Sequence, residues 1–469
     1  MVEANPTTAP PRQRWLTLPV VSAAQLLVVL DGTIVNIALP SAQRALDMTD
    51  ANRHWVITAY LLAFGGLLLL GGRVSGALGH RRAFLIGLTG FALASALGGM
   101  ASEPWILFAA RALQGAFAAL LAPAGLALLA TTFTGERERG RAFGVFAAVG
   151  AAGAAVGLIA GGLLTQYAGW RWCLYINVPI AALAMLGAVR IPRDRPHGGT
   201  VDIPGALLSV AGFSALVYGF SRAEALGWTH PLVLALLGGG IVALAIFVRV
   251  ELRAPHPLLP MRVLRHRGRA GAFTTIALTH VSMFGFFLFM SYHTQTVLDY
   301  SPVQAGLTLI VNALAAILGS TVIAGRLHGR VSPATLIVPS LLAIAAGIFV
   351  VTRTPARATD VLLPYLTPAL LLTGLGLGGI MAATATLATS GIGGHDAGTA
   401  SATYNASMQL GAALGTPLFN TVTIGAATSL ALTESATVAT VHGYRTALTV
   451  GLGIVLAATA IAAVTTRKA

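Results

Sequence analysis

Charged residues are scarce in this chain, and their scarcity excludes a soluble protein. Asp, Glu, Lys and Arg together make up 9% of the 469 residues, against about 25% in a typical soluble domain. Hydrophobic residues make up 56%. So few charges cannot cover a water-exposed surface of this size, and the composition therefore predicts a polytopic helical membrane protein.

Several motifs are also missing, and each absence removes a class of function. The single cysteine, Cys173, excludes an internal disulfide. No G-x-x-x-x-G-K-[ST] phosphate loop occurs, so ATP-driven transport is unsupported. No Asp-rich motif or Cys/His cluster indicates a metal site, and we predict neither a metal nor a cofactor. Gly374, Gly376 and Gly379 match the dinucleotide pattern G-x-G-x-x-G, but they lie inside an apolar span with no preceding strand, so we reject nucleotide binding.

Long apolar segments separated by polar turns predict fourteen transmembrane helices. A helix of about 20 apolar residues is long enough to cross a hydrocarbon core of about 30 Å. The predicted helices span residues 17–40, 54–72, 82–101, 104–130, 142–164, 172–190, 203–221, 231–250, 271–297, 303–325, 333–352, 361–388, 399–426 and 444–465. The first apolar run is too long for a signal peptide, so we expect it to remain as the first helix.

The distribution of basic residues predicts the orientation in the membrane. If the N-terminus is cytoplasmic, the inner loops and tails hold 21 of the 29 Lys and Arg residues, and the outer loops hold seven. The remaining one, Arg111, lies within a helix. This asymmetry follows the positive-inside rule and puts both termini in the cytoplasm. The formal net charge of +14 is therefore interpreted as a topology signal, and no nucleic-acid partner is predicted.

A faint internal repeat suggests that the chain has two halves. Gly72-RVSGALGHRRAF and Gly325-RLHGRVSPAT both close a helix with a Gly-Arg-aliphatic triplet and continue into a basic turn. The two turns become equivalent if the seventh and eighth helices are removed, and duplicated halves are common in transporters. The predicted parts are a cytoplasmic tail at 1–16, a six-helix bundle at 17–190, two extra helices with flanking basic loops at 191–269, a second six-helix bundle at 270–465 and a cytoplasmic tail at 466–469.

Asp31 and Arg111 carry opposite charges inside apolar segments. Asp31 lies nine residues from Pro40 and Arg111 lies eight residues from Glu103, so both lie about 12–13 Å from the outer ends of their helices. They can pair if the first and fourth helices are neighbours. An arginine neighbour favours an ionised carboxyl group, whereas desolvation favours the neutral acid, so a conformational change could alternate proton uptake and release. The alternative is a static ion pair that only fixes the packing.

Other polar residues on the predicted helices are candidates for a substrate cavity, although such residues often serve only as hydrogen bonds between helices. These candidates are Asn36, Tyr60, Gln114, Asn177, Gln295, Asn312, Tyr404, Asn405 and Gln409. The last three lie within about a turn and a half of helix. His280 is another mid-helix group that titrates near neutral pH, which makes it a candidate second proton site.

Three glycines, Gly153, Gly157 and Gly161, recur every fourth residue in the predicted fifth helix. This small-xxx-small pattern leaves one face of the helix without bulky side chains. A neighbouring helix can therefore approach that face closely with its backbone. We expect the three glycines to serve helix packing.

These motifs resemble the major facilitator superfamily, and specifically its fourteen-helix drug:proton antiporter branch. Leu30-DGTIVNIALP resembles the first-helix signature of that branch, and Arg111-ALQG resembles its fourth-helix motif, whose arginine the family links to proton transfer. Trp170-RWCLYINVPI and Val201-DIPGALL are also similar to this branch. The segment from Gly72 is similar to the inner loop between helices two and three, which gates the conformational change in the family. That loop would be carried here by Gly72, Arg73, Gly79, Arg81 and Arg82.

Two positions depart from the family pattern. Gly76 stands where the inner loop usually has an aspartate that helps to latch the cytoplasmic side. Leu158 follows Gly157 where the fifth-helix antiporter motif usually has proline. The resemblance therefore places more weight on Asp31 and Arg111 for antiport.

The residues and the resemblance together predict an all-α polytopic membrane protein of two six-helix bundles plus two extra central helices, acting as a secondary transporter and not as an enzyme. We expect it to export a small amphipathic or cationic compound, such as an antibiotic, in exchange for protons. Its partners would be this small molecule, protons and lipid, and it would act as a monomer in the bacterial plasma membrane. The alternatives are a dedicated metabolite exporter or importer of the same fold, or a membrane-embedded enzyme or sensor.

Overall fold

The computed structural model describes the whole chain except 1–10, 134–135, 193–201, 255–256, 260, 325–330, 356–360, 390–393, 431–434 and 467–469. Helices dominate the described residues, among which no strand occurs. Thirteen of these helices are long and apolar enough to cross a membrane, and one shorter apolar stretch spans Trp172–Ala188. Together they account for the fourteen predicted helices, so the all-α prediction is confirmed.

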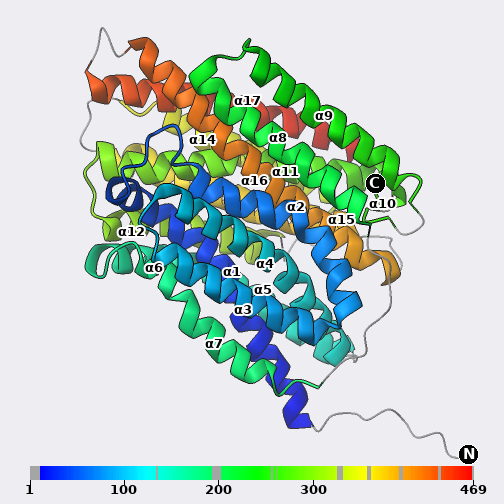
Figure 1. The fold of residues 1–469 in the computed structure, drawn as a ribbon. Coiled ribbons are helices and arrows are strands. Elements are labelled where there is room, and N and C mark those ends of the chain that lie inside the picture. Colours follow the sequence, from blue (N-terminus) through cyan, green and yellow to red (C-terminus); the bar gives the residue numbers. More distant parts are fainter. Residues whose placement is uncertain are drawn as a thin grey trace, which may run out of the picture.

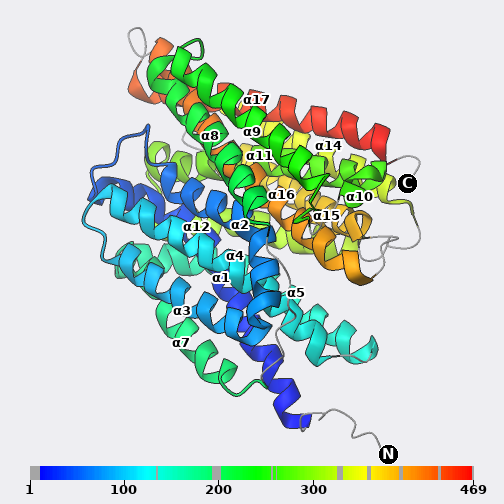
Figure 2. The ribbon, with the colours of Figure 1, turned by 45° about the vertical axis from the view of Figure 1, so that its right-hand side comes forward.

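The first half of the chain forms one bundle (Figures 1 and 2). Its helices are α1 (Pro11–Ala45), α2 (Trp55–Leu78), α3 (His80–Gly99), α4 (Pro104–Thr132), α5 (Glu136–Tyr167), α6 (Trp172–Tyr175) and α7 (Asn177–Ala188). Within this bundle α4 packs against α2 and α3, and α1 packs against α5 and α7. The predicted sixth helix is divided at Ile176 into the short α6 and the longer α7.

The second half forms a second bundle, and a helical hairpin lies between the halves in sequence. The hairpin is α8 (Ile203–Leu226) and α9 (Pro231–Glu251), followed by the short α10 (Met261–Arg265). The second bundle contains α11 (Arg267–Tyr292), the π-helical turn η1 (His293–Val297), α12 (Pro302–Leu318), η2 (Gly319–Ala324), α14 (Pro333–Thr352), η3 (Leu362–Leu366), α15 (Thr367–Thr389), α16 (Gly394–Leu430) and α17 (Ala436–Thr465). Helix α8 packs against both α2 and α16, so it lies against both bundles (Figure 1).

The two bundles meet through α5 against α12 and α2 against α16. Glycines allow close approach at both contacts: Gly162 faces Pro302 and Val303, and Gly65 faces Gln409. Hydrogen bonds between the halves involve the residues where α1 ends and α2 begins, described below. That end of the molecule lies opposite the start of α1, which is on the side marked N in Figure 1.

The segment between α2 and α3 is more helical than predicted. Helix α2 continues to Leu78, so Gly72 and Arg73 lie inside it, and Arg81 and Arg82 lie in the first turn of α3. Only Gly79 interrupts the helices, with a φ of 87° that favours glycine. The prediction that helix two ends at residue 72 was wrong because a glycine inside a helix costs only about 1 kcal/mol, which packing can offset. The equivalent turn at residue 325 lies outside the described residues.

The three spaced glycines of α5 face α1. A Cβ atom at Gly153 would meet the side chains of Leu26 and Val29, one at Gly157 would collide with Thr33, and one at Gly161 would meet the backbone of Ile34. The absence of side chains at these positions therefore lets α5 lie against the part of α1 that holds Asp31.

We expect Gly157→Leu to destabilise the fold, because the added side chain has no room against Thr33. Overpacking of this kind costs about 1–3 kcal/mol. Thermal unfolding of the purified protein in detergent measures the effect. Gly238→Leu is the matched control, since nothing lies within 4 Å of a Cβ at Gly238. Equal unfolding temperatures for the two variants would contradict close packing of α5 on α1.

Candidate functional site

The carboxyl group of Asp31 lies in the interior of the first bundle, opposite the guanidinium group of Arg111. Arg111 Nη1 donates to Asp31 Oδ2 at 2.6 Å. The side chain of Asp31 is 0% exposed and that of Arg111 is 2% exposed. The helices α1 and α4 are in contact, as this pairing requires. A pair so deeply buried is shielded from water, so each charge depends on its neighbours.

Two amide side chains complete the surroundings of the carboxyl group. Gln114 Nε2 donates to Asp31 Oδ1 at 3.0 Å, and Asn177 Nδ2 donates to the same oxygen at 2.8 Å. Both amides also donate to Ser95 Oγ, at 2.7 Å and 3.4 Å respectively. Asp31 therefore accepts three hydrogen bonds from α4 and α7, an arrangement suited to a carboxylate.

The remaining donors of Arg111 tie the pair to α2. Arg111 Nε donates to the carbonyl oxygen of Val56 at 2.9 Å, and Nη1 also donates to Gln114 Oε1 at 2.9 Å. The guanidinium carbon lies 4.4 Å from the ring centroid of Tyr60, a cation–π contact. The Tyr60 hydroxyl and Asn177 Oδ1 are buried without a hydrogen-bond partner among the described residues.

Asn36 and Gln295 lie at the contact between the two bundles. The Ser291 hydroxyl donates to the carbonyl oxygen of Asn36 at 2.6 Å, and Gln295 Nε2 donates to that of Ile37 at 3.2 Å. Asn36 uses its own side-chain amide on the carbonyl of Gly32, within α1. These residues therefore connect the end of α1 to α11 and η1.

The other cavity candidates lie in the second bundle, where most form hydrogen bonds to another helix or to the backbone of their own helix. Asn312 of α12 donates to the Leu370 carbonyl and the Thr373 hydroxyl of α15. The Tyr404 hydroxyl lies 3.0 Å from that of Thr384, across α15 and α16. Asn405 donates to the Ser401 carbonyl in its own helix. Gln409 lies against Gly65 of the first bundle.

His280 lies apart from the Asp31 site. Its Nδ1 lies 2.9 Å from the carbonyl oxygen of Ile276, in its own helix, and its ring lies beside that of Phe284. No acidic or basic side chain of the described residues forms an ion pair with it. Among the described residues, no group of three or more His, Cys, Asp and Glu could hold a metal ion.

Arg53 joins the bundles at the end where α2 begins. The Arg53 side chain is 9% exposed and forms an ion pair with Asp50 at 2.6 Å. It also donates to Asn420 Oδ1 of α16 at 3.3 Å, and its guanidinium carbon lies 3.9 Å from the Tyr292 ring centroid of α11. The Tyr292 hydroxyl in turn donates to Gln43 Oε1 at 2.5 Å. We call these five residues the Arg53 lock.

The residues of the predicted gating loop make contacts at the other end. Arg81 Nε and Nη2 donate to the carbonyl oxygens of Ala188 and Val189 at 3.1 Å and 2.6 Å. Arg73 Nη2 donates to the Pro257 carbonyl oxygen at 2.6 Å. A Cβ atom at Gly76 would meet nothing within 4 Å.

Ser95 and the Arg53 lock were not identified from the sequence. Ser95 looks unremarkable because a single serine in an apolar helix is common, and nothing local shows that two amides converge on it.

His54, next to Arg53, is also buried, and burial together with the Arg53 charge lowers its pKa to about 3. His54 is therefore neutral at physiological pH.

Two packed helical bundles with a charge pair inside one of them define a polytopic membrane transporter. The chain belongs to the Major Facilitator Superfamily, because the sequence model of that family matches residues 21–416. It is a small-molecule transporter and not an enzyme.

Relatives and solved structures agree with this assignment. The chain is 52% identical over 462 residues to the puromycin resistance protein pur8 of Streptomyces alboniger, covering 97% of this chain and 92% of that protein. It is 39% identical over 412 residues to the cephamycin export protein CmcT of Amycolatopsis lactamdurans, covering 87% and 84%. The crystal structure of the POT family transporter PepTSo matches the fold with a TM-score of 0.69 at 14% identity, covering 98% of both chains.

We expect Asp31→Asn to destabilise the protein by about 3–5 kcal/mol, because it leaves the buried Arg111 charge without its partner. The double variant Asp31→Asn with Arg111→Gln removes both charges and recovers most of that loss. Unfolding of the single, double and Arg111→Gln variants in detergent completes the cycle. Additive losses in the double variant would show that the two charges do not interact.

Proposed function

We propose that this protein exports antibiotic-like small molecules across the bacterial plasma membrane in exchange for protons. Asp31 binds the coupling proton, and Arg111, Gln114 and Asn177 control when it is bound. The protein acts as a monomer, uses the proton gradient as its energy source, and needs no cofactor. Both termini lie in the cytoplasm.

The observation that carries this proposal is the burial of Asp31 among donors from α4 and α7. A charged side chain at this depth costs about 2.5–3.5 kcal/mol on insertion scales, so it is rarely retained without a function. Three hydrogen bonds suit the carboxylate in the present conformation. A movement that withdraws Arg111 leaves the carboxyl group desolvated and favours its protonation. Two conformations thus bind the proton with different affinities, as coupling requires.

The proposed orientation places the Arg53 lock relative to the membrane. With cytoplasmic termini, the lock lies at the outer end and joins the two bundles there. Opening the lock while the inner ends of the bundles close exposes the site to the outside. Substrate entering from the cytoplasm then leaves to the exterior.

The resistance and export relatives support a drug-like substrate. Among them is the puromycin resistance protein, which is 52% identical to this chain. Asp31 is the one acidic residue identified deep in an apolar segment, which favours a neutral or singly charged compound over one with several positive charges.

Transport in proteoliposomes tests the proposal. We expect an acidic interior to drive puromycin uptake by the wild type and Asp31→Asn to abolish it, because the amide cannot exchange a proton. Glu103→Gln is the control, since Glu103 is an exposed acid at the start of α4 and should leave uptake unchanged.

Gradient-driven uptake by Asp31→Asn at the wild-type rate would refute proton coupling at Asp31, and His280 would be the next residue to substitute. A wild-type protein that responds to the gradient but ignores every drug of a lipophilic panel would favour the dedicated metabolite transporter. Accumulation in the direction of proton flow would favour an importer.

The Arg53 lock generates a separate prediction about access. We expect Arg53→Gln to speed maleimide labelling of a cysteine at position 291, in a Cys173→Ser, Ser291→Cys background. Position 291 is buried at the bundle contact. Loss of charged hydrogen bonds worth about 1.5–3 kcal/mol raises the open population about tenfold or more. Arg44→Gln, which removes an exposed arginine from the same region, is the control. Equal labelling rates for Arg53→Gln and Arg44→Gln would show that Arg53 does not hold this end closed.

A further inference from the structure

The hairpin of α8 and α9 contains a buried carboxyl group that the Asp31 mechanism does not use. Glu251 ends α9 and is 2% exposed. Its Oε2 accepts a hydrogen bond from the backbone N–H of Leu259 at 2.9 Å. Its Oε1 is buried and has no hydrogen-bond partner among the described residues. A buried, unpaired carboxylate oxygen is costly, so its surroundings should supply a donor.

Asp202 lies next to this oxygen, at the start of α8. It caps the helix, with Oδ1 accepting from the backbone N–H of Gly205 at 2.9 Å. Its Oδ2 is also buried without a hydrogen-bond partner. A Cβ atom at Gly205 would lie 2.6 Å from both Asp202 Oδ2 and Glu251 Oε1. The two unpartnered oxygens therefore face the same small space, which the glycine leaves open.

We propose that Asp202 and Glu251 share one proton between their facing oxygens and form a proton-binding site separate from Asp31. Each carboxylate can only accept a hydrogen bond, so two of them facing each other repel. One proton makes one group a donor to the other and satisfies both buried oxygens. A single proton thus gives both unpaired oxygens, Asp202 Oδ2 and Glu251 Oε1, a hydrogen-bond partner.

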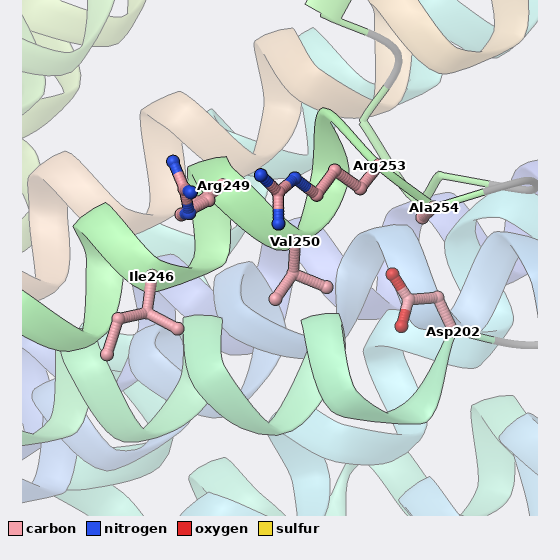
Figure 3. Close-up of a pocket in the computed structure, with 6 residues that line it drawn as sticks. All are labelled: Asp202, Ile246, Arg249, Val250, Arg253 and Ala254. Carbon is pink, nitrogen blue, oxygen red and sulfur yellow. The ribbon is translucent and has the colours of Figure 1, made fainter.

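Positively charged side chains lie near the pair, but within the described residues none forms an ion pair with either carboxyl group. A shallow cavity of about 450 Å³ adjoins Asp202 and is lined by Asp202, Ile246, Arg249, Val250, Arg253 and Ala254 (Figure 3). In Figure 3 the Asp202 carboxyl group points toward the region where α9 ends, and the guanidinium groups of Arg249 and Arg253 lie to its left, away from that carboxyl group. Neither Arg249 nor Arg253 forms an ion pair with Asp202 within the described ranges. Arg73 of α2, which donates to Pro257 in the connection after α9, is a further positive charge near Glu251.

The pair is positioned to act on the segment that resembles the family's gating loop. Glu251 holds the backbone of Leu259, and two residues earlier Pro257 accepts the hydrogen bond from Arg73. The connection after α9 thus links the proton pair to α2, beside the open space at Gly76. Loss of the proton places a second negative charge there and changes how firmly the connection is held. The cytoplasmic pH would then bias this end of the transporter.

Proton binding by the purified full-length protein in detergent tests the proposal. Acid–base titration between about pH 5 and 9 should show the wild type releasing about one proton more than Glu251→Gln or Asp202→Asn, since isolated carboxyl groups have already titrated below this range. Glu103→Gln should match the wild type. The measurement needs neither substrate nor gradient, so its failure is distinguishable from failure of proton coupling at Asp31.

The pH dependence of unfolding is the second measurement. The folded pair retains a proton that the unfolded carboxyl groups have lost, so wild-type stability should fall as pH rises through this range. Glu251→Gln should remove that fall because its amide donates to Asp202 without titrating. Asp202→Asn is the second variant, since asparagine also caps helices well. Titration and unfolding curves of Asp202→Asn that match those of the wild type would overturn the shared proton, whether or not Glu251→Gln folds.

Discussion

The burial of the Asp31 charge is the constraint on which the first bundle depends. A carboxylate removed from water must be matched by donors, and here they come from α4 and α7, with α2 and α3 holding those donors in turn. Four helices must therefore approach α1 closely or contact its partners. The glycines of α5 leave room for that helix to pack against the opposite side of α1. The polar centre and the apolar contacts thus specify the same arrangement.

Helix α1 connects the proposed proton site with the contact between the bundles. Asp31 lies on the same helix as the Asn36 and Ile37 carbonyls, which accept from the second bundle, and as Gln43 of the Arg53 lock. Pro40 lies between these positions and has no backbone N–H, so the Asn36 carbonyl is free to accept from Ser291 of the second bundle. Helix α1 is therefore the direct covalent connection between the proposed proton site and the residues that join the two bundles.

The Asp31–Arg111 charge pair could be predicted from the sequence, whereas most of the contacts around the pair could not. Helical rise alone put Asp31 and Arg111 at matching depths, and hydrophobic segments specified the number of helices. Gln114 and Asn177 were recognised as polar but were predicted to line a cavity, whereas both donate to Asp31 in this conformation. The local sequence around Arg53 does not show that Tyr292 and Asn420, far along the chain, enclose its side chain. Burial produced by distant segments is a tertiary property.

The two departures from the family motifs have different physical meanings. Leu158 stands in place of the family's proline where α5 meets α12. A Cβ atom at Gly306 of α12 would collide with the carbonyl oxygen of Leu158. Proline would keep that carbonyl but remove a backbone donor, so leucine leaves α5 regular at the bundle contact. At Gly76 the acid of the family pattern is absent, and Arg73 donates to the Pro257 carbonyl oxygen in the connection after α9. A carbonyl group cannot titrate, and the buried acid that holds the same connection is Glu251, which accepts from the backbone of Leu259.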